Sequence, residues 1–290
     1  QSGSEIVSNA AQTEWSHFKP MLRAAAGCWH DARGFAEHRA LAGYIARRAL
    51  GRAGLGSRGH GECAIRLGGL EIHVRPGGGE LCLCQEIFRD LVYERHPAFA
   101  LRPGWCVVDC GANIGMFSLR AARAACARIF ALEPDPETFA RLGLNLERNG
   151  AAAVTALRLA VGRAVGRAAF RRSDASTLGH LALAGAMTEK GADESASAWS
   201  EIFVDVTTLP ALLDCYAVPA VHLLKLDVEG SELEALEGAR PVLDRIERIV
   251  MEYHGAQSLG ACERLLRQHG FARMALAPPS HAYFAREWVC

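Results

Sequence analysis

The stretch WCVVDCGANIG (residues 105–115) runs from apolar residues into one aspartate and then into two glycines. Its apolar run up to Val108 predicts a fully buried strand, and the apolar residues from Ile114 onward predict the start of a helix. Gly111 and Gly115 would permit a sharp turn and let a ligand lie against the backbone, beside the N–H groups that open the helix. This arrangement is typical of a nucleotide site, although a tight turn without a ligand would carry the same glycines.

An acidic residue ends the next predicted strand. In the segment ARIFALEPDPE a short apolar strand is followed by Glu133, which comes 22 positions after Gly111. In α/β nucleotide folds, an acidic residue about 20 positions beyond the glycine turn binds ribose hydroxyls. We therefore expect Glu133 to bind a ligand. Asp135 and Pro136 have structural roles instead, as the N-cap and first residue of the following helix.

The glycine positions discriminate between two kinds of nucleotide. A dinucleotide-binding turn needs glycine at its first, third and sixth positions, because the pyrophosphate lies on the helix start. This turn has Gly111, Asn113 and Met116 there. Since the two larger side chains would obstruct a pyrophosphate, a nucleoside without phosphates fits better. S-adenosylmethionine is such a ligand, with a ribose for Glu133 and an amino-acid tail for the turn.

A third acidic residue ends another apolar strand, in the segment HLLKLDVEGSELEALEGA. The strand ends at Asp227, and Ser231 with Glu234 predicts a capping box for the next helix. Asp227 and Glu229 have no capping role, so we expect them to face the ligand, although Glu229 also fits a solvated loop. Lys225 lies inside the apolar strand and must reach a partner, because an isolated buried charge is costly.

Strand and helix patterns alternate through most of the chain, which predicts a mostly parallel sheet with helices on both faces. Ligands bind beyond the carboxyl ends of the strands in such sheets. The expected strands are 105–109, 128–132, 153–160, 221–227 and 248–253, and the expected helices are 115–126, 136–148, 231–245 and 259–268. Four acidic residues fall at the predicted strand ends: Asp109, Glu133, Asp227 and Glu252.

The chain is predicted to have two parts. Residues 1–60 form a helical N-terminal appendage with a glycine-rich linker, and residues 61–290 form the main domain. A hairpin is expected across Gly68 and Gly69, followed by a helix over 85–94. The polar segment 171–201 predicts an irregular loop above the strand ends, because a loop of this length is usually functional or disordered.

Composition is compatible with an intracellular enzyme, for which we expect a cytoplasmic location. The 290 residues have a formal net charge of zero, which argues against a nucleic-acid partner. The 10 cysteines show no zinc-like spacing and fit a reducing compartment. No apolar run approaches the length of a membrane helix, and no secretory signal opens the chain. The oligomeric state is left open, a homodimer being one possibility.

Five segments, in this order, resemble the FkbM family of S-adenosylmethionine-dependent methyltransferases over roughly residues 82–254: VVDCGANIGMFSL, IFALEPDPETFARLGLNLERNG, VTTLPALL, LLKLDVEGSELEALEGA and IVMEYH. The resemblance implies a Rossmann-like class I methyltransferase fold with seven strands, the last antiparallel. It also implies O-methylation of hydroxyls on sugars, polyketides or other secondary metabolites. Two residues depart from the family pattern: Cys110 replaces valine or isoleucine, and Pro210 replaces an aspartate.

Site residues follow from these observations. The enzyme must hold a nucleophilic oxygen in line with the activated methyl group, and a base that removes the hydroxyl proton adds to the rate. A divalent cation on the same carboxylates is possible but not favoured. N- or carboxyl-methylation of a peptide or natural product, and an inactive binding protein, are the alternative functions. The expected cofactor-binding residues are Asp109, Gly111, Ala112, Asn113, Gly115, Glu133, Pro134 and Asp227, and the expected catalytic residues are Asp227, Glu229, Glu252 and His254.

Overall fold

The chain divides into two compact units, Gln1–Asp90 and Leu91–Cys290. The computed structural model describes residues 23–30, 32, 34–52, 63–75, 79–173, 179–181, 199–275 and 280–286. The division between these compact units lies after the hairpin that was assigned above to the main domain. A separate domain over residues 1–60 stays a prediction.

The first unit combines helices with one hairpin. Its described helices are 23–30, α2 (Gly34–Arg52), α3 (Glu80–Cys84) and the π-helical turn η1 (Gln85–Arg89). Strands β1 (Cys63–Leu67) and β2 (Leu70–Val74) pair antiparallel across Gly68 and Gly69, whose positive φ angles of 56° and 82° suit a tight turn. The hairpin prediction is confirmed. The helix expected over 85–94 instead begins at Glu80 and ends at Arg89.

The second unit is built on a seven-stranded sheet with the order β12-β13-β11-β10-β3-β4-β5. Neighbouring strands from β11 to β5 are parallel, whereas β13 runs antiparallel to both of its neighbours. The predicted class I fold is confirmed, including the antiparallel last strand. The strands are β3 (Cys106–Cys110), β4 (Arg128–Leu132), β5 (Val154–Leu157), β10 (Leu223–Leu226), β11 (Arg248–Glu252), β12 (Phe271–Arg273) and β13 (His281–Arg286).

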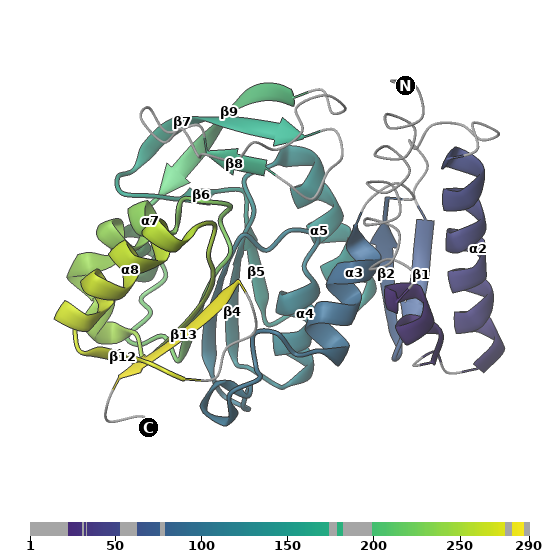
Figure 1. Cartoon of the computed structure of the whole chain (residues 1–290), viewed down its shortest axis with the longest axis horizontal. Helices are drawn as coiled ribbons and strands as arrows, with labels where there is room; N and C mark the ends of the chain where they lie inside the picture. Colours follow the sequence, from purple (N-terminus) through teal and green to yellow (C-terminus); the bar gives the residue numbers. More distant parts are fainter. Residues whose placement is uncertain are drawn as a thin grey trace, which may run out of the picture. The chain divides into compact units, whose positions relative to one another are not determined.

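Helices lie on both sides of this sheet, with α4 and α5 on one side and α7 and α8 on the other (Figure 1). The helical elements are η2 (Pro97–Phe99), α4 (Met116–Arg123), α5 (Pro136–Arg148), α6 (Leu209–Cys215), α7 (Glu232–Ala239), η3 (Arg240–Arg245) and α8 (Ala256–Gln268). The Asp135 side chain caps α5 by accepting from the Thr138 N–H at 2.8 Å, as predicted. The helix expected over 231–245 changes to a 3₁₀ turn at Arg240, because Pro241 cannot donate a backbone hydrogen bond.

A second sheet follows β5 at the carboxyl end of the central strands. Its strands are β6 (Ala160–Val161), β7 (Gly166–Ser173), β8 (Gly179–Leu181) and β9 (Trp199–Thr207), in the order β6-β9-β7-β8. Figure 1 shows them gathered at one end of the unit. The prediction of an irregular loop over 171–201 is therefore wrong at 171–173, 179–181 and 199–201. These residues belong to β7, β8 and β9, and β7 pairs with both of the others. The rest of that segment lies outside the described residues.

Apolar side chains fill the space between the sheet and its helices. Val108, Leu224 and Ile249, from three adjacent strands, are fully buried. Against this apolar background the buried Asp109, Glu133 and Lys225 need local partners, and these partners define the site. None of the helices in the described part of the chain is long and apolar enough to cross a membrane.

Candidate functional site

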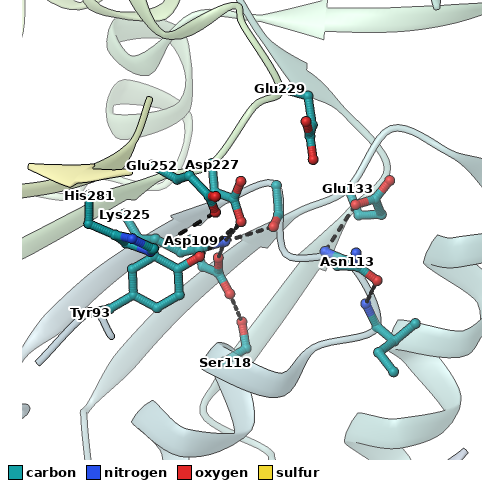
Figure 2. A network of polar contacts seen from close by, with 12 residues as sticks. Tyr93, Asp109, Asn113, Ser118, Glu133, Lys225, Asp227, Glu229, Glu252 and His281 are labelled. Carbon is teal, nitrogen blue, oxygen red and sulfur yellow. Dashed lines mark hydrogen bonds and ion pairs between the residues drawn. The ribbon is translucent and has the colours of Figure 1, made fainter. Parts of the chain in front are cut away.

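The turn after β3 uses its own N–H groups. Asn113 adopts a left-handed φ of 51°, and its N–H donates to Glu133 Oε2 at 3.0 Å. Its side-chain Oδ1 accepts from the Ile114 N–H at 2.8 Å (Figure 2). The N–H groups of Gly111 and Ala112 both donate to the Leu132 carbonyl, and that of Gly115 donates to Ala112. The N–H groups of the turn itself are thus engaged within the protein, whereas the N–H groups that open α4, expected above to lie beside a ligand, begin at Met116.

The two glycines of the turn are required by packing of the chain itself. Gly111 has a φ of +76°, and a Cβ there would lie 1.8 Å from the Asp227 carbonyl oxygen. Gly115 has a φ of +92°, and its Cβ would lie 2.6 Å from Leu142 Cδ1 in α5. Close approach of a ligand is therefore not needed to explain either glycine. Gly111 lets the loops after β3 and β10 meet.

Glu133 lies in the first loop after β4, next to this turn. Its side chain is 7% exposed, and its two oxygens accept from the Asn113 and Asp135 N–H groups at 3.0 and 2.9 Å. Burial raises the pKa of Glu133 to about 7, although the backbone hydrogen bonds oppose this shift. Each oxygen retains a lone pair. The carboxylate can therefore accept from a pair of ligand hydroxyls.

Lys225 finds the partners that its buried position demands. Its Nζ lies 2.8 Å from the Gly111 carbonyl oxygen, 3.1 Å from Asp109 Oδ1 and 3.4 Å from Asp227 Oδ2. Burial lowers the pKa of Lys225, but Asp109 and Asp227 outweigh it and raise the pKa above its usual range. Ser118 from α4 donates to Asp109 Oδ2 at 2.7 Å (Figure 2). Asp109 is fully buried among these partners, so its role is to hold the turn and the lysine.

Tyr93 is a site residue that the sequence did not reveal. Its hydroxyl donates to Asp227 Oδ2 at 2.9 Å, and its side chain is 5% exposed. Burial, followed by the charge of Asp227, raises the pKa of Tyr93 well above its usual range, so the hydroxyl keeps its proton and acts as a donor. No motif marks this residue, because its partner is 134 positions away in the chain.

His254 lies between two glutamates. Its Nε2 is 3.1 Å from Glu229 Oε2, and its Nδ1 is 3.0 Å from Glu232 Oε1. Burial lowers the pKa of His254, but the hydrogen bonds to Glu229 and Glu232 outweigh it and raise the pKa to about 10. The imidazole is therefore protonated at neutral pH. In that state it cannot accept a proton from a substrate, and it must lose its own proton before it can bind a metal.

The loop that carries Glu229 differs from the predicted capping box. Ser231 is the N-cap of α7 but makes no side-chain capping bond. Glu232 Oε1 instead accepts from the Gly230 N–H at 2.9 Å, while Glu229 adopts a positive φ of 50°. Backbone strain of this kind at a non-glycine residue is frequent at functional sites.

The structure brings most of the predicted site residues to one edge of the sheet. Figure 2 shows Asp227, Glu229 and Glu252 with Glu133 and Asn113 beyond the strand ends. Ligand atoms of Asp227, Glu229 and His254 lie within 4.8 Å of one another, a spacing that would also suit a metal ion. Glu252 accepts from the Ser280 hydroxyl at 3.4 Å and lies 4.0 Å from His281 Nε2. Ala112 and Pro134 lie in the same two loops as Asn113 and Glu133.

Comparison with known proteins assigns the chain to a family. The family model described as the methyltransferase FkbM domain matches residues 109–277, more than half of the chain. The chain belongs to the FkbM methyltransferase family. This FkbM-family chain is accordingly an S-adenosylmethionine-dependent methyltransferase. That the Asp109-to-Gly115 turn and Glu133 bind this cofactor stays a prediction.

Individual relatives extend this result. The chain is 34% identical to the 31-O-demethyl-FK506 methyltransferase FkbM of Streptomyces tacrolimicus, over 72% of this chain and 88% of that protein. It is 31% identical to the hexuronic acid methyltransferase AglP of Haloferax volcanii, over 50% of this chain and 54% of that protein. A crystal structure of methyltransferase FkbM from Methylobacillus flagellatus KT covers 91% of this chain and 58% of its own length, with 17% identity and a TM-score of 0.47. Similarity at that level adds nothing to the assignment.

Proposed function

We propose that this enzyme transfers a methyl group to a hydroxyl oxygen of a small molecule, such as a sugar, a polyketide or another secondary metabolite. The names of two relatives support an acceptor of this class: a 31-O-demethyl-FK506 methyltransferase and a hexuronic acid methyltransferase. The structural observation that carries the proposal is the state of Asp227. Its Oδ2 accepts a hydrogen bond from the Tyr93 hydroxyl and lies near Lys225 Nζ. Its Oδ1 has no hydrogen-bond donor among the described residues.

The cofactor supplies a sulfonium methyl group that is already a strong electrophile. Glu133 would accept hydrogen bonds from its ribose hydroxyls, and the turn from Asp109 to Gly115 would face its amino-acid tail. These residues come from the ends of adjacent parallel strands, so their positions are fixed by the sheet. Positioning of this kind supplies on the order of 7–11 kcal/mol of the acceleration in well-oriented reactions.

Asp227 would remove the proton of the acceptor hydroxyl. Its Oδ1 would accept the hydroxyl hydrogen bond, orient the oxygen towards the methyl group and take the proton as the C–O bond forms. The bond between the methyl group and sulfur would break in the same step, leaving the neutral thioether of the demethylated cofactor. Lys225 lies beside the carboxylate and remains protonated, so it offsets part of the negative charge that Asp227 and Asp109 place there. His254 is a weaker candidate, because both of its ring nitrogens face carboxylates.

Glu229 and Glu252 are proposed to help to hold the acceptor. Glu229 Oε2 lies 3.1 Å from His254 Nε2, and one Glu229 oxygen lies within 4.8 Å of an Asp227 oxygen. Glu252 ends β11, the strand next to β10. Two further carboxylates beside Asp227 suit an acceptor with several hydroxyl groups, because each carboxylate can accept hydrogen bonds from sugar-like diols.

The proposal is tested by methyl transfer from S-adenosylmethionine labelled in its methyl group. The acceptor panel contains hexuronic acids, neutral sugars and polyketide alcohols, together with peptides and amines that offer nitrogen. Label that appears as an ether in a hydroxylated acceptor supports the proposal. Label found only on nitrogen or as a methyl ester would show another acceptor class. Cofactor binding without transfer to any acceptor would favour an inactive binding protein.

A further inference from the structure

Tyr93 is held in place by contacts on both sides of it in the chain. Leu91 starts a tight turn with a positive φ of 50°, and its carbonyl accepts from the Glu94 N–H at 2.7 Å. The Tyr283 hydroxyl from β13 donates to the Val92 carbonyl and accepts from the Arg95 N–H. A side chain between such fixed neighbours has little freedom to move.

A partly buried ion pair between Glu94 and Arg120 fixes the same segment to α4. Glu94 is 8% exposed, and its two oxygens accept from Arg120 Nε and Nη2 at 2.8 and 3.1 Å. The Tyr93 ring also packs edge-on against Phe117 of α4 and His281 of β13, with centroid distances of 5.2 Å in both cases. The protein therefore orients this tyrosine with a bidentate ion pair, a strained turn and two aromatic contacts.

The held hydroxyl is directed at one oxygen of Asp227. Tyr93 donates to Oδ2 at 2.9 Å, and Lys225 Nζ lies 3.4 Å from the same oxygen and 5.2 Å from the centre of the tyrosine ring. Two donors on Oδ2 fix the rotation of the carboxylate about the Cβ–Cγ bond of Asp227. Oδ1 is then the oxygen left to face a ligand, since no donor among the described residues reaches it.

We propose that Tyr93 is a positioning residue: its hydrogen bond to Asp227 Oδ2 orients the carboxylate so that Oδ1 faces the acceptor hydroxyl. This role depends on the proposed O-methylation only in one respect, which is that the acceptor group is a hydroxyl. The geometry of the carboxylate applies to any substrate proton that Asp227 removes.

The decisive experiment follows Asp227 directly and needs no acceptor. Carboxyl carbon-13 resonances are titrated in the full chain, and the Asp227 signal is assigned by its absence in Asp227→Asn. We expect Tyr93→Phe to move the Asp227 titration to higher pH by about one to two units, the loss expected for one hydrogen bond to a charged group. A midpoint that stays at its wild-type position would overturn the proposal. The groups around this pair that also titrate or carry charge are Asp109, Lys225, Glu229, Glu252, His254 and His281.

Kinetics with the first active acceptor provide the second readout. Tyr93→Phe should lower turnover about 10- to 100-fold and move the acid limb of the pH profile upward, while affinity for S-adenosylmethionine is unchanged. The double variant with Asp227→Asn should be no slower than Asp227→Asn alone, and additive losses would contradict action through Asp227. Tyr216→Phe is the matched control, because this ring packs on Phe130 away from the site and should leave turnover intact.

These two readouts separate the proposals. If wild-type protein methylates no hydroxyl, O-methylation fails while the titration still tests Tyr93. If wild-type protein is active and Tyr93→Phe matches it in turnover and pH profile, the Tyr93 proposal fails. Circular dichroism and cofactor binding verify that the variant is folded. The phenylalanine retains the aromatic contacts with Phe117 and His281, so loss of the fold is not expected.

Discussion

The backbone N–H of Asn113 donates to Glu133 Oε2 at 3.0 Å, and this bond joins the turn after β3 to the end of β4. Asn113 holds a left-handed backbone conformation that asparagine tolerates better than most residues. The bond thus fixes the cofactor turn through the residue predicted to bind the ribose. Changes at Glu133 should therefore act on the turn as well as on the ligand.

Affinity for S-adenosylmethionine should increase as the pH rises through about 7. Burial raises the pKa of Glu133 to about 7, so the carboxyl is partly protonated near neutral pH. Ribose hydroxyls donate to the ionised form, and binding therefore releases a proton. Calorimetry in buffers between pH 6 and pH 8 would measure both effects. Glu133→Gln should remove the pH dependence and weaken binding by about 1–3 kcal/mol.

The matched control is Glu137→Gln in the same connection, where the side chain is 60% exposed and pairs with Arg172. It should leave affinity and its pH dependence unchanged. An affinity that stays constant with pH in the wild-type protein would argue against Glu133 as the ribose acceptor.

Gly111→Ala should prevent the loops after β3 and β10 from meeting. The added Cβ would lie 1.8 Å from the Asp227 carbonyl oxygen, at a φ of +76° that alanine disfavours. We expect a loss of roughly 3 kcal/mol or more in unfolding free energy, measured by denaturant titration. Gly143→Ala in α5, where no atom lies within 4 Å of the added Cβ, should be neutral or stabilising. Equal stability of the two variants would contradict this account of Gly111.

Local patterns in the sequence were sufficient to predict the limits of the strand and the helix that follow the cofactor turn. The limits of β4 and α5 agree with the expected 128–132 and 136–148, because an apolar run and an Asp-Pro helix start are both read from neighbouring residues. The capping box at Ser231 failed because the Ser231 N–H, which Glu234 was expected to accept, donates to the Val228 carbonyl instead. A pattern of residue types does not show that a backbone carbonyl in the preceding loop takes this N–H.

Contacts between distant residues account for what the sequence did not show. The β7 strand, GRAAFRRS, carries few apolar residues, and its conformation follows from pairing with β9. Tyr93 becomes a site residue only because β10 brings Asp227 to it across 134 positions. The protonated state of His254 likewise depends on Glu229 and Glu232 meeting the same ring.

A chelator should leave methyl transfer intact. Asp227, Glu229 and His254 have the spacing of a metal site. The His254 imidazole, however, is already hydrogen-bonded to Glu229 and Glu232. A divalent ion would have to displace the proton from a group whose pKa is raised to about 10. Activity is measured before and after dialysis against EDTA, with Mg²⁺, Mn²⁺ or Zn²⁺ then returned. Loss of activity with recovery by one ion would establish a metal requirement.

The protein should become less stable at alkaline pH, because His254 then loses its proton and with it the ion pairs to Glu229 and Glu232. The folded-state pKa of about 10 lies above the unfolded value of 6.5, so the stabilisation is fully present below about pH 6.5 and is lost as the pH rises through about 10. His254→Gln should reduce the fall in unfolding free energy over this interval. His269→Gln, at the end of α8, is the control for removal of a histidine. Parallel stability curves for wild type and His254→Gln would contradict the imidazolium assignment.

Asp227→Asn should lower turnover by roughly 10²- to 10⁴-fold while affinity for S-adenosylmethionine changes much less. Asparagine keeps the shape and can still accept from Tyr93, but it cannot take a proton from the acceptor hydroxyl. The fold should survive, because Lys225 retains Asp109 at 3.1 Å and the Gly111 carbonyl at 2.8 Å. Asp214→Asn, whose side chain is 71% exposed in its pair with Arg245, controls for the loss of a carboxylate and should be fully active. If Asp227→Asn turns over a saturating acceptor at the wild-type rate, the proton is taken elsewhere, and Glu229→Gln and Glu252→Gln become the variants that identify the base.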